Sequence, residues 1–225
     1  MGGSRAAHQN GTAPTTEITD MGIHFSVMSG KLEGLRAISS NTATNEFCVD
    51  QNEHGGDNNI CTKCYSHAML RTYRKNMAPA LQRNSDYLSS ALIPIEHIPF
   101  IPDAYLRINA HGELINDTHF MNILRIAERN PHCSIALWTK RVDIVRRVLK
   151  QWLAKPANLI LIYSNPKIGH IMPKPPRGFD RSFNNVPADM APERQNCTGQ
   201  KCVTCMLCYT IGNGVDTIVE KVKKY

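Results

Sequence analysis

The sequence has no long hydrophobic run. Its 225 residues are 42% hydrophobic, yet no apolar stretch approaches the roughly 20 residues that a membrane-spanning helix needs. Residues 1–20 contain neither an apolar core nor a small-residue cleavage pattern, so they do not look like a secretory signal. We therefore expect a cytoplasmic protein without a membrane segment. Residues 1–20 should form a disordered tail, and residues 21–225 a single α/β domain that includes a cysteine-rich segment at 195–210.

Several catalytic patterns are also missing. The sequence contains no Ser-His-Asp arrangement, no nucleotide-binding glycine loop and no paired carboxylates in one short motif, so hydrolase and kinase chemistry have no support. Acidic residues are in the minority, with 19 Asp and Glu against 26 Lys and Arg and a net charge of +7. Positive charge suits nucleic acid as a partner, although the scattered basic residues favour a plain positive surface.

The middle of the chain alternates strands and helices. Apolar sequences at 104–110, 133–139 and 158–164 predict three strands, with a helix after each of the first two. Asn116 or Asp117 is suited to cap the first of these helices. Short connections favour a parallel sheet with right-handed crossovers. We expect an α/β fold, either a partial parallel β/α barrel or an open doubly wound sheet, with a C-terminal cysteine-rich segment that binds metal.

The rest of the chain is less regular. The residue patterns predict, in order, a strand from Ile23, a loop from about Ser39 to Asn59, a helix that begins near Cys61, a second helix near Pro79, an irregular excursion over 165–194 with six prolines, and a short helix or strand at the C-terminal end.

The eight cysteines fall into two groups and one isolated residue. Cys133 begins a predicted strand and is typical of a small buried hydrophobic side chain. In a reducing cytosol, clustered thiols hold metal or carry out redox chemistry more often than they form disulfides. The proposed metal ligands are Cys48, Cys61 and Cys64 in the first group, and Cys197, Cys202, Cys205 and Cys208 in the second.

Their spacing favours iron–sulfur clusters over zinc. The second group reads C-x4-C-x2-C-x2-C. A structural zinc site usually separates its two cysteine pairs by a longer loop, whereas closely spaced thiols suit a 4Fe–4S cluster. The first group has three thiols, which leaves an iron free for a cosubstrate. Alternatively the two groups share one centre, or His54 or His67 completes a zinc site.

Parts of the chain resemble the phage gene product eighty-eight family, whose members are cysteine-rich and of poorly defined function. The resemblance rests on "FCVD", "NNICTKCYSHAMLRTYR", "LRINAHGELINDTHFMNILRIAERNPHCSIALWTKR" and "CTGQKCVTCMLCY", and runs from about Phe47 to Tyr209. It implies a phage protein that acts in the cytoplasm of a bacterial host.

A more distant similarity is to radical S-adenosylmethionine (SAM) enzymes, on the basis of Cys61-x2-Cys64 before a helix and of "HGEL" after a strand. In that family a Gly-Glu segment helps to hold the amino group of SAM. The similarity implies that Gly112 permits close backbone approach and that Glu113 accepts from the ammonium group. Arg107 would line the same cavity at the strand ends, and Lys140 lies at an equivalent edge.

Two function classes follow. The first is an iron–sulfur enzyme, redox or radical-SAM-like, with one or two 4Fe–4S clusters and with SAM as a candidate cosubstrate. The alternative is a zinc-stabilised protein that binds nucleic acid or is structural and performs no catalysis. The sequence does not identify the substrate.

Overall fold

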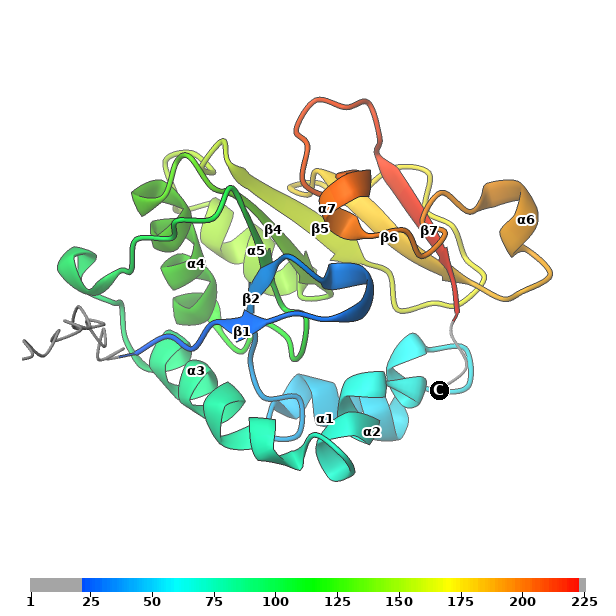
Figure 1. Cartoon of the computed structure of the whole chain (residues 1–225), viewed down its shortest axis with the longest axis horizontal. Helices are drawn as coiled ribbons and strands as arrows, with labels where there is room; N and C mark the ends of the chain where they lie inside the picture. Colours follow the sequence, from blue (N-terminus) through cyan, green and yellow to red (C-terminus); the bar gives the residue numbers. More distant parts are fainter. Residues whose placement is uncertain (1–21, 223–225) are drawn as a thin grey trace, which may run out of the picture.

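A single seven-stranded sheet organises the residues that the structure describes, which are 22–222 of the computed structural model. The strands lie in chain order across the sheet (Figure 1). Only the first pair is antiparallel; every other neighbouring pair is parallel. The strands are β1 (Ser26–Val27), β2 (Arg36–Ile38), β3 (Tyr105–Ile108), β4 (Ser134–Thr139), β5 (Leu159–Ser164), β6 (Arg181–Val186) and β7 (Thr217–Lys221).

This order decides between the two expected architectures only in part. A doubly wound sheet reverses its strand order at a switch point, and no reversal occurs among the described strands, so that alternative is wrong. The sheet is not a closed barrel either, because β1 and β7 remain its edges. A side-chain contact nevertheless links the two sides: Lys31, in the turn between β1 and β2, forms an ion pair with Glu220 of β7.

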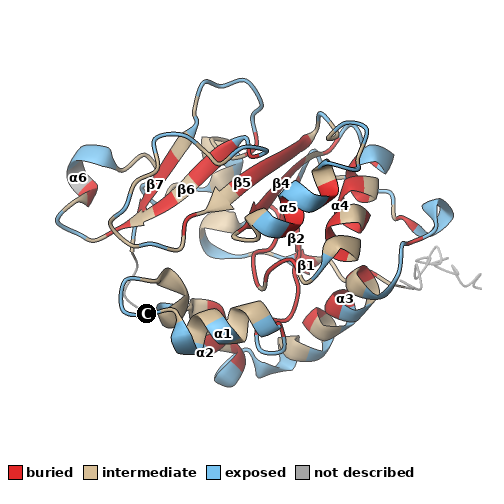
Figure 2. Cartoon of the chain, turned by 180° about the vertical axis from the view of Figure 1, so that it is seen from behind, coloured by how far each residue is buried: buried red, intermediate tan, exposed pale blue. Residues whose placement is uncertain are grey.

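Helices cover the sheet unequally. Helices α4 and α5 lie on one face, and α7 lies on the other (Figures 1 and 2). The α-helices are α1 (Glu46–His54), α2 (Tyr65–Arg71), α3 (Ala78–Ser90), α4 (Asp117–Arg129), α5 (Val142–Leu149), α6 (Ala191–Arg194) and α7 (Cys202–Cys205). Short 3₁₀ helices are η1 (Gly30–Leu32), η2 (Ile60–Lys63), η3 (Lys75–Met77) and η4 (Ile95–His97). None of the described helices is long and apolar enough to cross a bilayer.

The predicted central elements are confirmed. Strands β3, β4 and β5 and helices α4 and α5 occupy the expected segments. Asn116 caps α4, because its side chain accepts a hydrogen bond from the backbone N–H of His119 at 2.9 Å. The apolar face of α4 is fully buried against the sheet, and each such side chain contributes roughly 1.5–3 kcal/mol by leaving water. Its members are Phe120, Ile123, Leu124 and Ala127.

Strand β4 shows why these strands are apolar on both faces. Ile135 and Leu137 point into the core beneath α4 and α5. Ala136 and Trp138 point to the opposite face, where a second cluster packs under Tyr209 of the cysteine-rich segment. Successive side chains alternate between the faces of a strand. The chain therefore needs apolar residues at every position of a strand that is covered on both sides.

Three segments differ from expectation. Helix α1 lies inside the segment expected to be a loop. None of its residues is buried, and its sequence lacks the apolar periodicity that marks a helix. Strand β6 lies within the proline-rich excursion, with Pro187 immediately after its last residue instead of inside it. The expected strand from Ile23 is reduced to β1. The expected tail, 1–20, lies outside the described residues.

Candidate functional site

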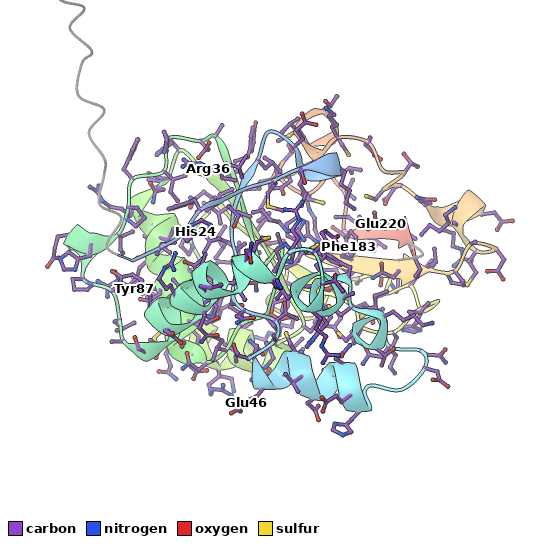
Figure 3. The ribbon with its side chains drawn as sticks, turned by 60° about the horizontal axis from the view of Figure 1, so that its bottom comes forward. His24, Arg36, Glu46, Tyr87, Phe183 and Glu220 are labelled. Carbon is purple, nitrogen blue, oxygen red and sulfur yellow. The ribbon has the colours of Figure 1, made fainter. Side chains whose placement is uncertain are left out.

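A cavity of about 700 Å³ brings the two cysteine groups together. It opens where the carboxyl ends of the parallel strands meet, which is where ligands bind in parallel sheets. Figure 3 labels Phe183 of β6 and Glu220 of β7, both in the cavity wall. Its volume lies within the range of about 300–1,000 Å³ for small-molecule sites. The cysteines that line it are Cys48, Cys61, Cys64, Cys197, Cys202 and Cys208.

Two asparagines fix the backbone of the first group. Asn45 caps α1, and its side chain accepts from the N–H of Cys48 at 3.1 Å. Asn59 caps η2, and its side chain accepts from the N–H of Cys61 at 2.9 Å. Cys64 ends η2, begins α2 and donates its own N–H to the Cys61 carbonyl at 3.2 Å. Side-chain caps therefore hold Cys48 and Cys61 at the cavity, and a backbone hydrogen bond to Cys61 holds Cys64.

Burial dominates the electrostatics of these thiols. It raises the pKa of Cys48 and of Cys61, and the charge of Lys140 opposes the shift at both. For Lys140, burial works against the ammonium, but the neighbouring Cys61 and Glu113 raise its pKa overall. Buried thiolates need a nearby positive charge. Lys140 supplies one, and a bound metal centre would supply more.

No three His, Cys, Asp or Glu side chains between residues 22 and 222 gather tightly enough to hold a single metal ion. Zinc requires its sulfur ligands at about 2.3 Å. A 4Fe–4S cluster binds each thiolate to a different iron, so its ligands stand further apart. The three thiols of the first group line one cavity, and the cluster proposed for them remains a prediction. The expected metal binding of the C-terminal segment remains a prediction.

The second group folds back onto β7. The N–H of Cys197 donates to the carbonyl of Val219 at 3.0 Å, and α7 carries Cys202 and Cys205. All four thiols line a void of about 20 Å³, which is close to the volume that one water molecule needs. The void is small for a cubane, and the thiols do not stand close enough to hold a single ion unless the segment moves. Lys31 lies 3.9 Å from the Cys197 sulfur.

The structure gives Gly112 and Glu113 roles within the chain. Gly112 has a φ of +76°, and a Cβ there would lie 2.1 Å from the Ser40 hydroxyl oxygen. The Glu113 carboxylate is 2% exposed and accepts from the N–H of Leu114 at 2.8 Å and of Lys140 at 2.7 Å. It therefore fastens the loop after β3 to the end of β4. Both residues line the cavity, and their proposed contacts with SAM remain predictions.

His54, His67 and Arg141 differ in their position relative to the cavity. His54 does not line the cavity and hydrogen-bonds Asp50 at 3.2 Å on the exposed side of α1. His67 lines the cavity and is 5% exposed; burial lowers its pKa, and a hydrogen bond with the Cys48 backbone acts in the opposite direction. Arg141 turns away from the cavity and pairs with Asp143 at 2.8 Å. Of these residues, only His67 is placed to meet a ligand.

Sequence patterns did not reveal several other residues of the wall. His111 hydrogen-bonds the Ser66 hydroxyl at 3.0 Å, and burial, aided by Arg107, lowers its pKa to about 4. It is therefore neutral at physiological pH. Trp138 lies beneath the predicted Arg107, whose guanidinium carbon is 3.3 Å from the ring centre. Strand alternation alone signalled that Trp138 points away from α4 and α5.

A family model described as gene product 88 matches residues 29–196, which include the first cysteine group and the strands from β2 to β6. No curated protein and no solved structure shows a significant match to the chain.

Proposed function

The chain belongs to the gene product 88 family, and we propose that it is an iron–sulfur enzyme whose first cluster is held by Cys48, Cys61 and Cys64. One observation carries the proposal: thiols from two distant parts of the sequence line one cavity of about 700 Å³. A structural metal site is normally closed around its ion, whereas a reactive centre keeps an open position. Here the thiols face open space.

The residues around the first group suit an anionic cluster. Lys140 places a half-buried ammonium beside the thiols and offsets their negative charge. The Glu113 carboxylate accepts a 2.7 Å hydrogen bond from the backbone N–H of Lys140, which fixes the backbone from which the ammonium extends. When bound, a cluster of this kind supplies one-electron chemistry. The cavity also has room for a cosubstrate such as SAM, for which the support is the resemblance around Gly112 and Glu113.

The second group is proposed to hold a second iron–sulfur cluster, with Cys197, Cys202, Cys205 and Cys208 as its ligands. The alternative there is zinc, which the small void of about 20 Å³ among the four thiols favours over a larger cluster, although the thiols would have to move closer together to bind one ion. In that case the ion would hold the segment against β7. If the first group then bound no iron–sulfur cluster, the protein would be a zinc-stabilised structural or nucleic-acid-binding protein.

The test is iron, zinc and acid-labile sulfide analysis of protein purified without oxygen, together with its visible spectrum. We expect iron and sulfide in matching amounts in the wild type and a clear loss of both in Cys61→Ser. Cys205→Ser reports on the second group alone. Cys133→Ala is the matched control, because Cys133 is fully buried in the core and away from the cavity. Unchanged iron and sulfide in Cys61→Ser would overturn the assignment of that residue.

A further inference from the structure

The wall of the cavity carries an excess of positive charge. Among the described residues that line it, two carry a carboxylate, Glu113 and Glu220. The basic side chains that line it are Lys31, Lys63, Arg74, Arg107, Lys140 and Lys221. Three of them, at positions 63, 74 and 221, are solvent-exposed and form its rim. The remaining three lie deeper, and their partners decide what the cavity attracts.

Two of the deeper cations are satisfied by the chain. Lys31 forms an ion pair with Glu220 and approaches the Cys197 sulfur. Lys140 is held between Glu113 and the thiols of the first cysteine group. Each therefore has a chain anion whose charge it offsets. Either lysine could bind an anionic ligand only by giving up its interaction with the anion within the chain.

Arg107 differs from both. It makes no ion pair with any residue in the described part of the chain, it contacts the Tyr209 hydroxyl, and its Nε atom is buried without a hydrogen-bond partner. One face of its guanidinium lies on the Trp138 ring at 3.3 Å, which fixes the plane of the group. The Tyr209 hydroxyl lies within reach of the guanidinium: burial raises its pKa, and the charge of Arg107 and a side-chain hydrogen bond with Arg107 oppose that shift. Leaving buried donors unpaired costs free energy, so such an arrangement calls for a ligand.

We propose that Arg107 binds the carboxylate or phosphate group of a small anionic ligand between the two cysteine groups. A planar guanidinium matches both anions through two parallel hydrogen bonds. A cavity of about 700 Å³ accepts a small molecule, whereas a nucleic-acid chain would contact phosphate-binding residues spread over an exposed surface. The identity of this ligand as a substrate rests on the proposed function; its binding does not.

The test measures binding of inorganic phosphate and, separately, of succinate by calorimetry on the full chain purified without oxygen. Arg107→Met removes the charge, and Arg107→Lys keeps the charge but loses the planar fork. Arg146→Met is the matched control, since Arg146 is exposed on α5 and has the same charge. We expect about tenfold or greater loss of affinity in Arg107→Met, a smaller loss in Arg107→Lys and none in the control. The better-bound probe identifies the anion class.

Several results would overturn the inference. The first is that the wild type binds neither anion at millimolar concentration. The second is that wild type and Arg107→Lys bind the anion with equal affinity. The third is that a single-stranded oligonucleotide binds more tightly than either anion and that Arg107→Lys leaves this binding unchanged. Lost iron with unchanged anion affinity in Arg107→Met would mean that Arg107 serves the thiolates of the second group. Circular dichroism shows whether each variant is folded. If Arg107→Met is unfolded, the affinity of Arg107→Lys alone tests the inference. Anion binding that depends on Arg107 in iron-free protein would support this inference and contradict the cluster.

Discussion

Replacing Gly112 by alanine tests how tightly the loop after β3 is packed. A Cβ at this position would lie 2.1 Å from the Ser40 hydroxyl oxygen and 2.4 Å from the Ser40 carbonyl oxygen. Ser40 cannot easily withdraw, because its hydroxyl exchanges hydrogen bonds of 3.0 Å with the backbone N–H and C=O of Glu113. The substitution therefore forces two buried backbone segments apart.

Gly56 provides a matched control. Its φ is also +76°, but nothing lies within 4 Å of a Cβ built there. The left-handed conformation costs an alanine about 1–2 kcal/mol, partly offset by about 0.4–1 kcal/mol from the less flexible unfolded chain. Both variants carry this balance. Gly112→Ala adds an overpacking cost of about 1–3 kcal/mol, which is a large fraction of typical domain stability.

The assay is equilibrium unfolding in urea of the wild type and both variants, followed by far-ultraviolet circular dichroism. We expect Gly112→Ala to lose about 1–3 kcal/mol more than Gly56→Ala, with a lower urea midpoint. Adding Ser40→Ala should recover only part of the loss, because the Ser40 carbonyl remains. If Gly112→Ala were no less stable than Gly56→Ala, the packing of Gly112 against Ser40 would be refuted.

Three further predictions concern single buried contacts. Burial lowers the pKa of His119 to about 4, so the unfolded chain, with an ordinary pKa near 6.5, binds more protons as pH falls. Stability should drop between pH 6.5 and 4, and His119→Asn should lose about 2 kcal/mol less than wild type between pH 7 and 4.5 in urea titrations; equal losses would contradict the burial of a neutral imidazole. Glu113→Gln places an amide where the carboxylate accepts from backbone N–H groups, and it should lower the free energy of unfolding by about 1–3 kcal/mol in the same assay. An unchanged urea midpoint would refute a stabilising role for the hydrogen bond from Lys140 to Glu113. Asn59→Ala removes the acceptor for the Cys61 N–H and should cost about 1 kcal/mol and lower the iron retained on gel filtration; full retention would show that the cap does not position Cys61.

The sequence predicted the central part of the fold because its signals are local. Helix α4 shows an apolar stripe and an asparagine cap, and both act within a few residues. Helix α1 shows neither a stripe nor a buried residue, so its cap Asn45 could not be distinguished from the other asparagines of an Asn-rich stretch. Strand β6 was not predicted because prolines precede and follow it in the sequence, although none lies within it.

The candidate site could be predicted by residue type but not by partner. Cysteine spacing identified both groups, and strand order placed Arg107 and Glu113 near a common edge. The contact of Lys31 with Glu220 joins residues 189 positions apart in the sequence, and no periodic pattern encodes such a pair. The packing of Ser40 on Gly112 is equally remote, so the sequence did not show that the chain itself already needs a glycine at this position.

Native mass spectrometry of protein purified without oxygen tests the central claim most directly, because it weighs the intact chain with whatever its thiols hold. We predict a mass increment of at least one iron–sulfur cluster, which is lost in Cys61→Ser and kept in Cys133→Ala. A bare chain, or one that carries only zinc and is unaffected by Cys61→Ser, would contradict the assignment of Cys48, Cys61 and Cys64 as cluster ligands.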